Sequence, residues 1–188
     1  MTVQQLLRRL ISALDLSEIP YMVTGSYASS IHGMPRATRD IDIIVMPTRD
    51  QLARFIEQLP HSSYYSALED AIEALRRRRQ FNIIDLSTGW KVDFIIPPLT
   101  EFNVEEFERR QEVEIDGLRL YVASPEDILV AKLTWAKEGA SDRQIEDAAG
   151  VINGQGADLD IAYVQRWVRR LGLEDQLRAA RAKALELN

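Results

Sequence analysis

The chain has 188 residues, 46% of them hydrophobic, which is enough for one folded domain with a helical extension and argues against disorder. Its formal net charge of -6 argues against non-specific DNA binding, because proteins that grip long nucleic acids usually carry a basic excess. No apolar stretch of about 18 residues is present, so we expect no membrane-spanning helix. Because cysteine is absent, disulfides and thiolate metal sites are excluded, and the cytoplasm is the expected location.

The first two thirds of the chain predict alternating helices and strands. Residues 3–14 have the pattern of an amphipathic helix rather than of a signal peptide. The elements expected next are a strand over 21–24, a short helix over 26–32, a strand over 41–45, helices over 48–60 and 66–80, strands over 81–86 and 91–96, a helix over 100–111, and a hairpin over 113–123 with its turn at Asp116 and Gly117.

From Ser124 onward the pattern predicts helices only. Ser124 is a good N-cap, Pro125 suits the first helical position, and the acidic Glu126 and Asp127 favour the positive end of a helix. We therefore predict an α+β protein with a mixed sheet, divided into an α/β domain at 1–123 and a helical domain at 124–188.

Asp40 and Asp42 are the first chemical signal, because they flank a single isoleucine in a strand. Residues two apart in a strand point to the same face, so both carboxylates project together while Ile41 enters the core. Adjacent carboxylates repel each other unless a cation such as Mg²⁺ or Mn²⁺ compensates them. A third acid, Asp93, lies among apolar residues of a later strand, and three such groups could hold two metal ions roughly 3.5 to 4 Å apart. The alternative is an acidic strand edge that only solubilises the sheet.

Gly25 and Ser26 follow the apolar run that ends at Thr24. A glycine leaves room for a phosphate beside the backbone, and Ser26 offers a hydroxyl at a helix N-terminus, where free N–H groups favour anions. The alternative is an ordinary strand-to-helix turn with a serine cap.

At these residues the sequence resembles the nucleotidyltransferase superfamily, which has the polymerase-β-like fold. The matching features are the Gly-Ser turn that ends a strand, the Asp-x-Asp strand after a helix, and the single later aspartate. More narrowly, the chain is similar to the AbiEii-type toxins and their uncharacterised relatives over residues 20–175. The stretches that carry this likeness are GSYASSIHGMPRATRDIDIIV, RRRRQFNIIDLSTGWKVDFII and SPEDILVAKLTWAKEGASDRQIEDAAGVI.

The resemblance implies transfer of a nucleoside monophosphate from an NTP to an acceptor hydroxyl, with release of pyrophosphate. Asp40 and Asp42 would bind metal and triphosphate, and Asp93 would complete the metal site and help to deprotonate the acceptor. It further implies that Lys132 binds near the phosphates. The acceptor could be tRNA or another RNA, a protein or a small molecule such as an aminoglycoside, and a toxin–antitoxin member would have a cognate antitoxin.

Lys132 also has a structural interpretation. It shares a helical stripe with Ile128 and Trp135, so its stem could cover the core while its ammonium group reaches water. Some relatives carry a Lys-Asp pair on the next helix, where this chain has Arg143 and Gln144. We therefore expect no acidic role at position 144.

Arginines offer further candidates for anion binding. Arg36 and Arg39 flank the acidic strand and could clamp phosphate or pair with the aspartates, and Arg39 is our additional nucleotide-binding candidate. The run Arg76–Arg79 fits a solvated helix end better than an RNA contact. Among the remaining polar residues, His32 and His61 lack metal-ligand spacing, and Asp85 is expected to shape the following turn.

Two hypotheses from different classes follow. The first is a Mg²⁺-dependent nucleotidyltransferase, and the second is a catalytically inactive member of the same fold that binds nucleotides or another protein. Three mutually repelling carboxylates favour the first, because an inactive site has no need of them. Phosphodiester hydrolysis at the same metals is less favoured, since no nuclease-like His or Asp spacing is present.

Overall fold

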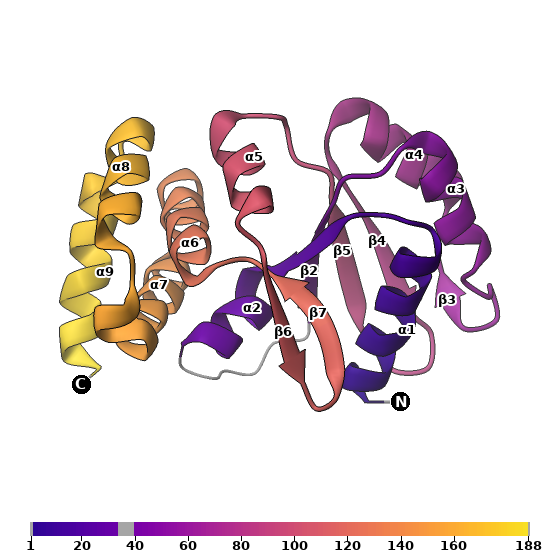
Figure 1. Ribbon diagram of the computed structural model, residues 1–188, viewed down its shortest axis with the longest axis horizontal. Helices are drawn as coiled ribbons and strands as arrows, with labels where there is room; N and C mark the ends of the chain where they lie inside the picture. The colour runs from indigo at the N-terminus through magenta and orange to yellow at the C-terminus, as the bar shows by residue number, and fades with distance from the viewer. Residues whose placement is uncertain (1, 34–39, 188) are drawn as a thin grey trace. The chain divides into compact units, whose positions relative to one another are not determined.

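The structure is a computed structural model that describes residues 2–33 and 40–187 (Figure 1). It has a mixed seven-stranded sheet and a set of C-terminal helices, which confirms the predicted α+β class. Contacts within the chain divide the described residues into two compact units, one containing 2–23 and 40–122 and the other containing 24–33 and 123–187. Residues 24–33 thus cluster with the C-terminal helices, although they lie between two strands in the sequence.

The sheet forms the centre of the first unit. Its strands are β1 (Tyr21–Thr24), β2 (Asp40–Val45), β3 (Tyr64–Tyr65), β4 (Gln80–Asp85), β5 (Lys91–Ile95), β6 (Gln111–Ile115) and β7 (Leu118–Val122). They are arranged in the order β3-β4-β5-β2-β1-β7-β6. The β2–β5 and β1–β7 pairs are parallel, whereas β3–β4, β4–β5 and β6–β7 are antiparallel.

Helix α3 (Arg49–Glu57) packs on the sheet through a small aromatic cluster. The helices of this unit are α1 (Val3–Leu16), α3, α4 (Leu68–Arg77) and α5 (Glu101–Glu108). The ring of Phe94 on β5 lies 5.2 Å from that of Phe55 on α3 and 5.1 Å from that of Phe81 on β4, measured between centroids. The face of β5 that carries Phe94 is therefore the face that α3 covers.

The second unit consists of helices. They are α2 (Gly25–His32), α6 (Pro125–Gly139), α7 (Asp142–Gln155), a 3-10 turn η1 (Gly156–Asp158), α8 (Ile161–Leu171) and α9 (Glu174–Glu186). The Ser124 hydroxyl accepts a hydrogen bond of 3.2 Å from the Asp127 N–H, and Pro125 occupies the first turn, as the sequence predicted. Glycines let α2 and α7 approach closely, because a Cβ on Gly154 would lie 2.6 Å from the Gly33 Cα.

The predicted elements are present with shifts of a few residues at their ends, but one strand was missed. β3 contains only Tyr64 and Tyr65, too few residues to show an alternating pattern. The Asp116–Gly117 turn is confirmed, with both residues at positive φ (49° and 72°). Within the described ranges, no helix combines the length and apolarity that a membrane crossing requires.

The aromatic cluster gives a test of the fold. Phe94 is fully buried, so Phe94→Ala should lower the free energy of unfolding by about 3–5 kcal/mol through lost burial and a new cavity. Urea denaturation followed by circular dichroism measures this change. Leu99→Ala is the control, because Leu99 is 63% exposed and should change stability by about 0.5 kcal/mol or less. Equal losses in the two variants would contradict this packing.

Candidate functional site

Three carboxylates from two neighbouring strands lie on one face of the sheet, and we call Asp40, Asp42 and Asp93 the carboxylate row. β2 and β5 pair so that Asp42 lies opposite Asp93 and Asp40 lies opposite Lys91. Side chains alternate along a strand, so Asp40 and Asp42 share a face of β2, and Lys91 and Asp93 share the corresponding face of β5. The structure thus brings together the three acids that the sequence singled out.

The carboxylate row faces away from α3. Phe94 packs on Phe55 of that helix, and the adjacent Asp93 therefore points to the opposite face. On β4, Asn82 is the register partner of Asp93, so polar side chains form a line across three strands. Asp40 is exposed, Asp42 is half-buried and Asp93 is buried.

Lys91 of β5 is a cation in contact with this row. Its Nζ lies 2.7 Å from Oδ2 of Asp93, with the lysine side chain 41% exposed and the aspartate side chain 9% exposed. The hydrogen bond to Asp93 raises the pKa of Lys91 against the opposing effect of burial, and the charges of Asp93, Asp40 and Asp42 raise it further. The amine is therefore fully protonated at neutral pH and neutralises part of the negative charge of the row.

The row has the donor set that a hard divalent cation prefers. Its ligands would be carboxylate oxygens, and Oδ1 of Asp93 is buried with no hydrogen-bond partner among the described residues. In residues 2–33 and 40–187, however, no three acidic or histidine groups are arranged closely enough to hold a metal ion. Asp93 instead turns Oδ2 toward Lys91.

The second unit contains a buried cluster of Ser26, Lys132 and Asp147, which we call the Lys-Asp-Ser cluster. Lys132 Nζ donates to Oδ2 of Asp147 at 2.7 Å and to Oγ of Ser26 at 3.2 Å. The Ser26 hydroxyl also lies 3.4 Å from Oδ2 of Asp147. The lysine is only 1% exposed, so its ammonium group does not reach water as the structural interpretation supposed.

This cluster is attached to the Gly-Ser turn. Gly25 opens α2 with φ of 69°, a conformation that costs little only for glycine, and Ser26 is the next residue. The N-cap residue Thr24 makes no side-chain capping bond, so the first N–H groups of α2 are not satisfied by a cap. The turn therefore has the features of an anion site at a helix N-terminus.

Other predicted residues have structural roles or are not described. Arg36 and Arg39 lie outside the described residues. His32 Nε2 is 2.9 Å from the Ala123 carbonyl oxygen, and burial lowers the pKa of its imidazole. Oδ1 of Asp85 accepts bonds from the backbone and hydroxyl groups of Ser87 and Thr88, so this acid shapes its turn as expected.

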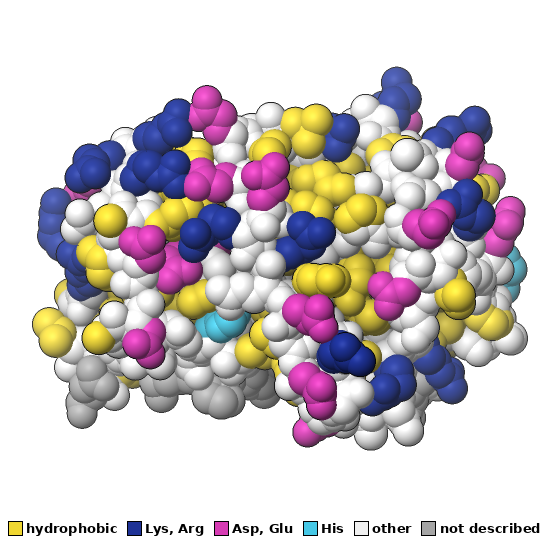
Figure 2. All heavy atoms as spheres, viewed as in Figure 1, with side chains coloured by type: hydrophobic (Ala, Val, Ile, Leu, Met, Phe, Trp, Pro, Cys, Tyr) yellow, Lys and Arg dark blue, Asp and Glu magenta, His cyan; other side chains and the backbone are white. Residues whose placement is uncertain are grey.

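The arginine run is a helix end. Arg76 donates two hydrogen bonds of 2.8 Å to Glu73, and Arg77 also pairs with Glu73. Arg78 ends α4 with a left-handed φ of 51°. Over the face shown in Figure 2, basic and acidic side chains are interspersed rather than gathered into one basic surface.

Sequence reasoning missed Lys91 and Asp147. The acid that pairs with Lys132 is Asp147, which lies about one helical turn after Gln144. The apolar Val151, four residues later and therefore on the same helix face, could have signalled that Asp147 points into the helical unit. Lys91 could have been found from its spacing, because it lies two residues before Asp93 and therefore shares its face.

The buried ion pair can be tested by a double-mutant cycle. Lys132→Met or Asp147→Leu alone should lower the free energy of unfolding by about 3–5 kcal/mol, because each leaves an uncompensated charge. The double variant Lys132→Met/Asp147→Leu should recover most of that loss. The measurement is chemical denaturation of all four proteins, and strictly additive losses would show that the pair does not act as a unit.

Comparisons with solved structures agree with this architecture. The solution structure of the antibiotic-resistance factor ANT(2'')-Ia is similar with 16% identity and a TM-score of 0.60, covering 95% of this chain and 98% of that chain. The crystal structure of ANT(2'')-Ia with adenylyl-2''-tobramycin is similar with 16% identity and a TM-score of 0.53, covering 90% of this chain and 97% of that chain. The crystal structure of an antigenic nucleotidyltransferase-like protein from Paracoccidioides brasiliensis is similar with 18% identity and a TM-score of 0.51. The match covers 93% of this chain and 91% of that chain. At these identities the likeness shows a shared nucleotidyltransferase-like fold.

The sequence comparisons give the family. No curated protein matches the sequence. Residues 1–166 match the family described as nucleotidyltransferase of unknown function (DUF6036), which is most of the chain. The carboxylate row and the Gly-Ser turn lie within the matched range. The chain therefore belongs to this family of nucleotidyltransferases.

Proposed function

We propose that the protein transfers a nucleoside monophosphate from an NTP to a hydroxyl group of an acceptor, and that the reaction requires Mg²⁺ or Mn²⁺. The observation that carries the proposal is the register of β2 on β5, which places Asp42 beside Asp93 with Asp40 on the same face. Membership of the nucleotidyltransferase family supports the same reaction class. A purely structural sheet has no need for three acids at these positions.

The carboxylate row would hold the metal ions. Asp40, Asp42 and Asp93 offer hard oxygen ligands, and the unpartnered Oδ1 of Asp93 fits a site that is completed by another group. Divalent ions bound there would stabilise the negative charge of the triphosphate. The match of donor type to cation is the reason for assigning the metal to this row.

The chemical step follows from the same side chains. The acceptor oxygen attacks the α-phosphorus, a new P–O bond forms, and the bond to the leaving pyrophosphate breaks. The acceptor proton passes to a carboxylate, for which we propose Asp93, since its Oδ1 accepts no hydrogen bond from the described residues. Asp40 and Asp42 would keep the triphosphate in line with the attacking oxygen through the divalent ions that they would hold.

We assign the phosphates to the Gly-Ser turn. Gly25 and Ser26 would bind phosphate oxygens with the N–H groups of α2 and the serine hydroxyl. Lys132 would act through Ser26, whose Oγ it contacts at 3.2 Å, and would fix the direction of that hydroxyl. Lys132 is therefore a positioning residue in this proposal, and Arg39 remains a further candidate for phosphate binding.

A small hydroxylated molecule is the acceptor that the comparisons favour. ANT(2'')-Ia, which has a similar fold, has a crystal structure in complex with adenylyl-2''-tobramycin, an adenylylated small molecule. We carry only the class of acceptor to this chain. RNA and protein acceptors, the AbiEii-like relationship, a cognate antitoxin and the inactive nucleotide-binding module remain alternatives that the following experiment separates.

Asp42→Asn tests the proposal. The purified protein is incubated with each α-³²P-labelled NTP and Mg²⁺ or Mn²⁺, with tobramycin, tRNA or no added acceptor, and labelled products are separated by thin-layer chromatography and gel electrophoresis. We expect label on an acceptor with the natural protein and a loss of at least about 100-fold with Asp42→Asn. Thermal stability should not fall, since a neutral residue relieves repulsion in the row.

The matched control is Asp50→Asn, which neutralises an exposed aspartate of α3 and should keep full activity. If no label transfers to any acceptor and Mn²⁺ does not bind to the natural protein, the enzymatic proposal is wrong. Nucleotide binding without transfer, unchanged in Asp42→Asn, would establish the inactive module instead.

A further inference from the structure

Lys91 occupies an unusual place for a lysine on the surface of a sheet. It lies opposite Asp40 in the β2–β5 register and two residues from Asp93 on the same strand face. Its Nζ contacts Oδ2 of Asp93 at 2.7 Å. A positive charge thus sits among three negative ones, in the region where the proposed function requires a divalent cation.

We propose that Lys91 is an internal counter-ion that competes with divalent cations for Asp93. In the metal-free protein its ammonium group neutralises the carboxylate row and holds Oδ2 of Asp93. When metal binds, Lys91 leaves that oxygen and Asp93 turns toward the other two acids. This inference rests on the proposed function, because it assumes that the row is the metal site.

Two observations support the competition. The described residues contain no group of three acids arranged for a metal, although Asp42 and Asp93 are register partners. The contact with Lys91 holds Oδ2 of Asp93. Repulsion among the acids would separate them in the absence of any cation, so the lysine both stabilises the free protein and weakens metal binding.

The exposure of Lys91 indicates how strongly it should compete with a metal ion. The Lys91 side chain is 41% exposed, so water screens its ion pair and the pair contributes little stability. A metal ion can therefore displace it readily, and the lysine should weaken metal binding only modestly. We expect a change of about three- to tenfold in the dissociation constant for Mn²⁺ when the charge is removed.

The experiment measures Mn²⁺ binding without nucleotide, by electron paramagnetic resonance of the free ion. Lys91→Met should bind Mn²⁺ about three- to tenfold more tightly than the natural protein, whereas Lys91→Arg, which keeps the charge, should bind like it. In EDTA, Lys91→Met should melt only slightly below the natural protein, because the partly exposed pair contributes little stability, and saturating Mn²⁺ should remove that difference. Lys183→Met is the matched control, because it breaks a lysine–glutamate pair on α9 with the same change of charge.

The outcomes separate the inference from the proposed function. If the natural protein and Lys91→Met both fail to bind Mn²⁺, the metal site itself is wrong and both ideas fall. If the natural protein binds Mn²⁺ and Lys91→Met binds it equally or more weakly, only the competition is wrong. Lys91→Gln repeats the measurement should Lys91→Met fold poorly.

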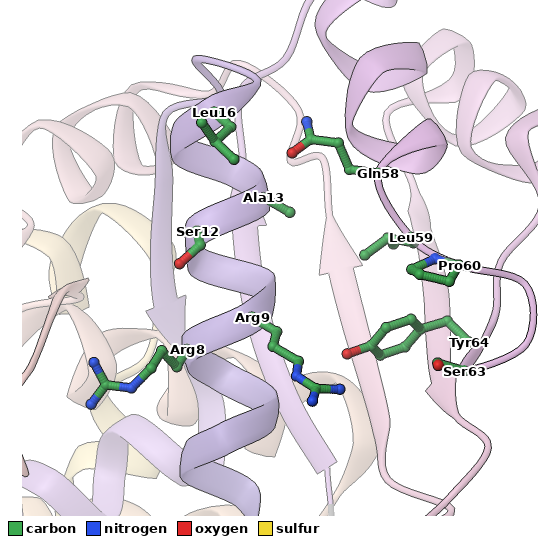
Figure 3. A pocket seen from close by; sticks show the side chains of 10 residues that line it. All are labelled: Arg8, Arg9, Ser12, Ala13, Leu16, Gln58, Leu59, Pro60, Ser63 and Tyr64. Atoms are coloured by element: carbon green, nitrogen blue, oxygen red, sulfur yellow. The ribbon is translucent and has the colours of Figure 1, made fainter.

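A second, independent observation concerns a cavity of about 510 Å³ in the first unit. Its walls come from α1 and from the segment 58–64 that leads into β3 (Figure 3). In Figure 3 the Tyr64 ring extends from β3 toward α1, and the Arg9 side chain leaves α1 toward β3. Tyr64 pairs with Asp85, which shares its strand face with Ile83 and Phe81, so the tyrosine is on the sheet face opposite to the carboxylate row.

Two polar groups in this cavity have no described partner. Tyr64 is 3% exposed, and its hydroxyl forms no hydrogen bond within residues 2–33 and 40–187. A buried hydroxyl without a partner costs about 1–3 kcal/mol. Arg9 makes no hydrogen bond or ion pair with the described residues. Its positive charge and the donor O–H both suit an anion.

The remaining walls are apolar. Ala13, Leu16, Leu59 and Pro60 line the cavity, and Leu16 is 75% exposed at its edge. We propose that this cavity binds a small organic anion with an apolar body, whose acidic group meets Arg9 and the Tyr64 hydroxyl. The positive charge of Arg9 favours a ligand with a negative charge, and the apolar walls favour a ligand with an apolar body.

The probe for this site is 8-anilinonaphthalene-1-sulfonate, an anion with an apolar ring system, titrated by fluorescence. Tyr64→Phe and Arg9→Gln should each weaken binding by about five- to tenfold, through loss of one polar contact. Tyr65→Phe is the matched control on the neighbouring, 57% exposed tyrosine, and should bind like the natural protein. Tyr64→Phe should not unfold more easily, since the hydroxyl has no partner to lose. Equal binding by all proteins, or a clear loss of stability in Tyr64→Phe, would overturn the assignment.

Discussion

The pairing of β2 with β5 is the constraint on which the candidate site depends. Backbone hydrogen bonds between these parallel strands place Asp42 opposite Asp93 and Asp40 opposite Lys91. A shift of one residue would put Asp42 opposite Val92 or Phe94, whose side chains point to the face covered by helix α3. The buried aromatic cluster around Phe94 prevents such a shift, because it would carry apolar side chains to the polar face. The same strand register therefore sets both the packing of the core on one face of the sheet and the positions of the acids on the other face.

Each unit of the protein also pairs a lysine with an aspartate, but in different surroundings. Lys132 and Asp147 are buried, so desolvation makes their pairing obligatory and ties α6 to α7 and to Ser26. Lys91 is partly exposed, so water screens its pairing with Asp93 and the pair contributes little stability. The first pair is suited to holding a turn in one conformation, and the second to a charge that changes partners. The two ion pairs differ in how deeply their lysines are buried.

The chemistry of a nucleotidyltransferase needs negative groups for the metal and positive or N–H groups for the phosphates. We propose that in this chain the acids on the sheet meet the first need, and that the Gly-Ser turn with the Lys-Asp-Ser cluster meets the second. In the sequence, Gly25 directly follows the last residue of β1. The family assignment covers both sets of residues.

The sequence by itself determined the local chemistry of this protein. Alternation placed Asp40 and Asp42 on one strand face, and Ser124 and Pro125 marked the start of α6, because each of these signals acts within a few residues. The resemblance of its motifs, in their order along the chain, indicated the nucleotidyltransferase fold. It did not reveal β3, whose two residues form a strand only because β4 pairs with them. Nor did it reveal that Asp147 pairs with Lys132 or that Lys91 holds Asp93. Those contacts depend on how helices pack and which strands become neighbours, and only the tertiary structure decides that.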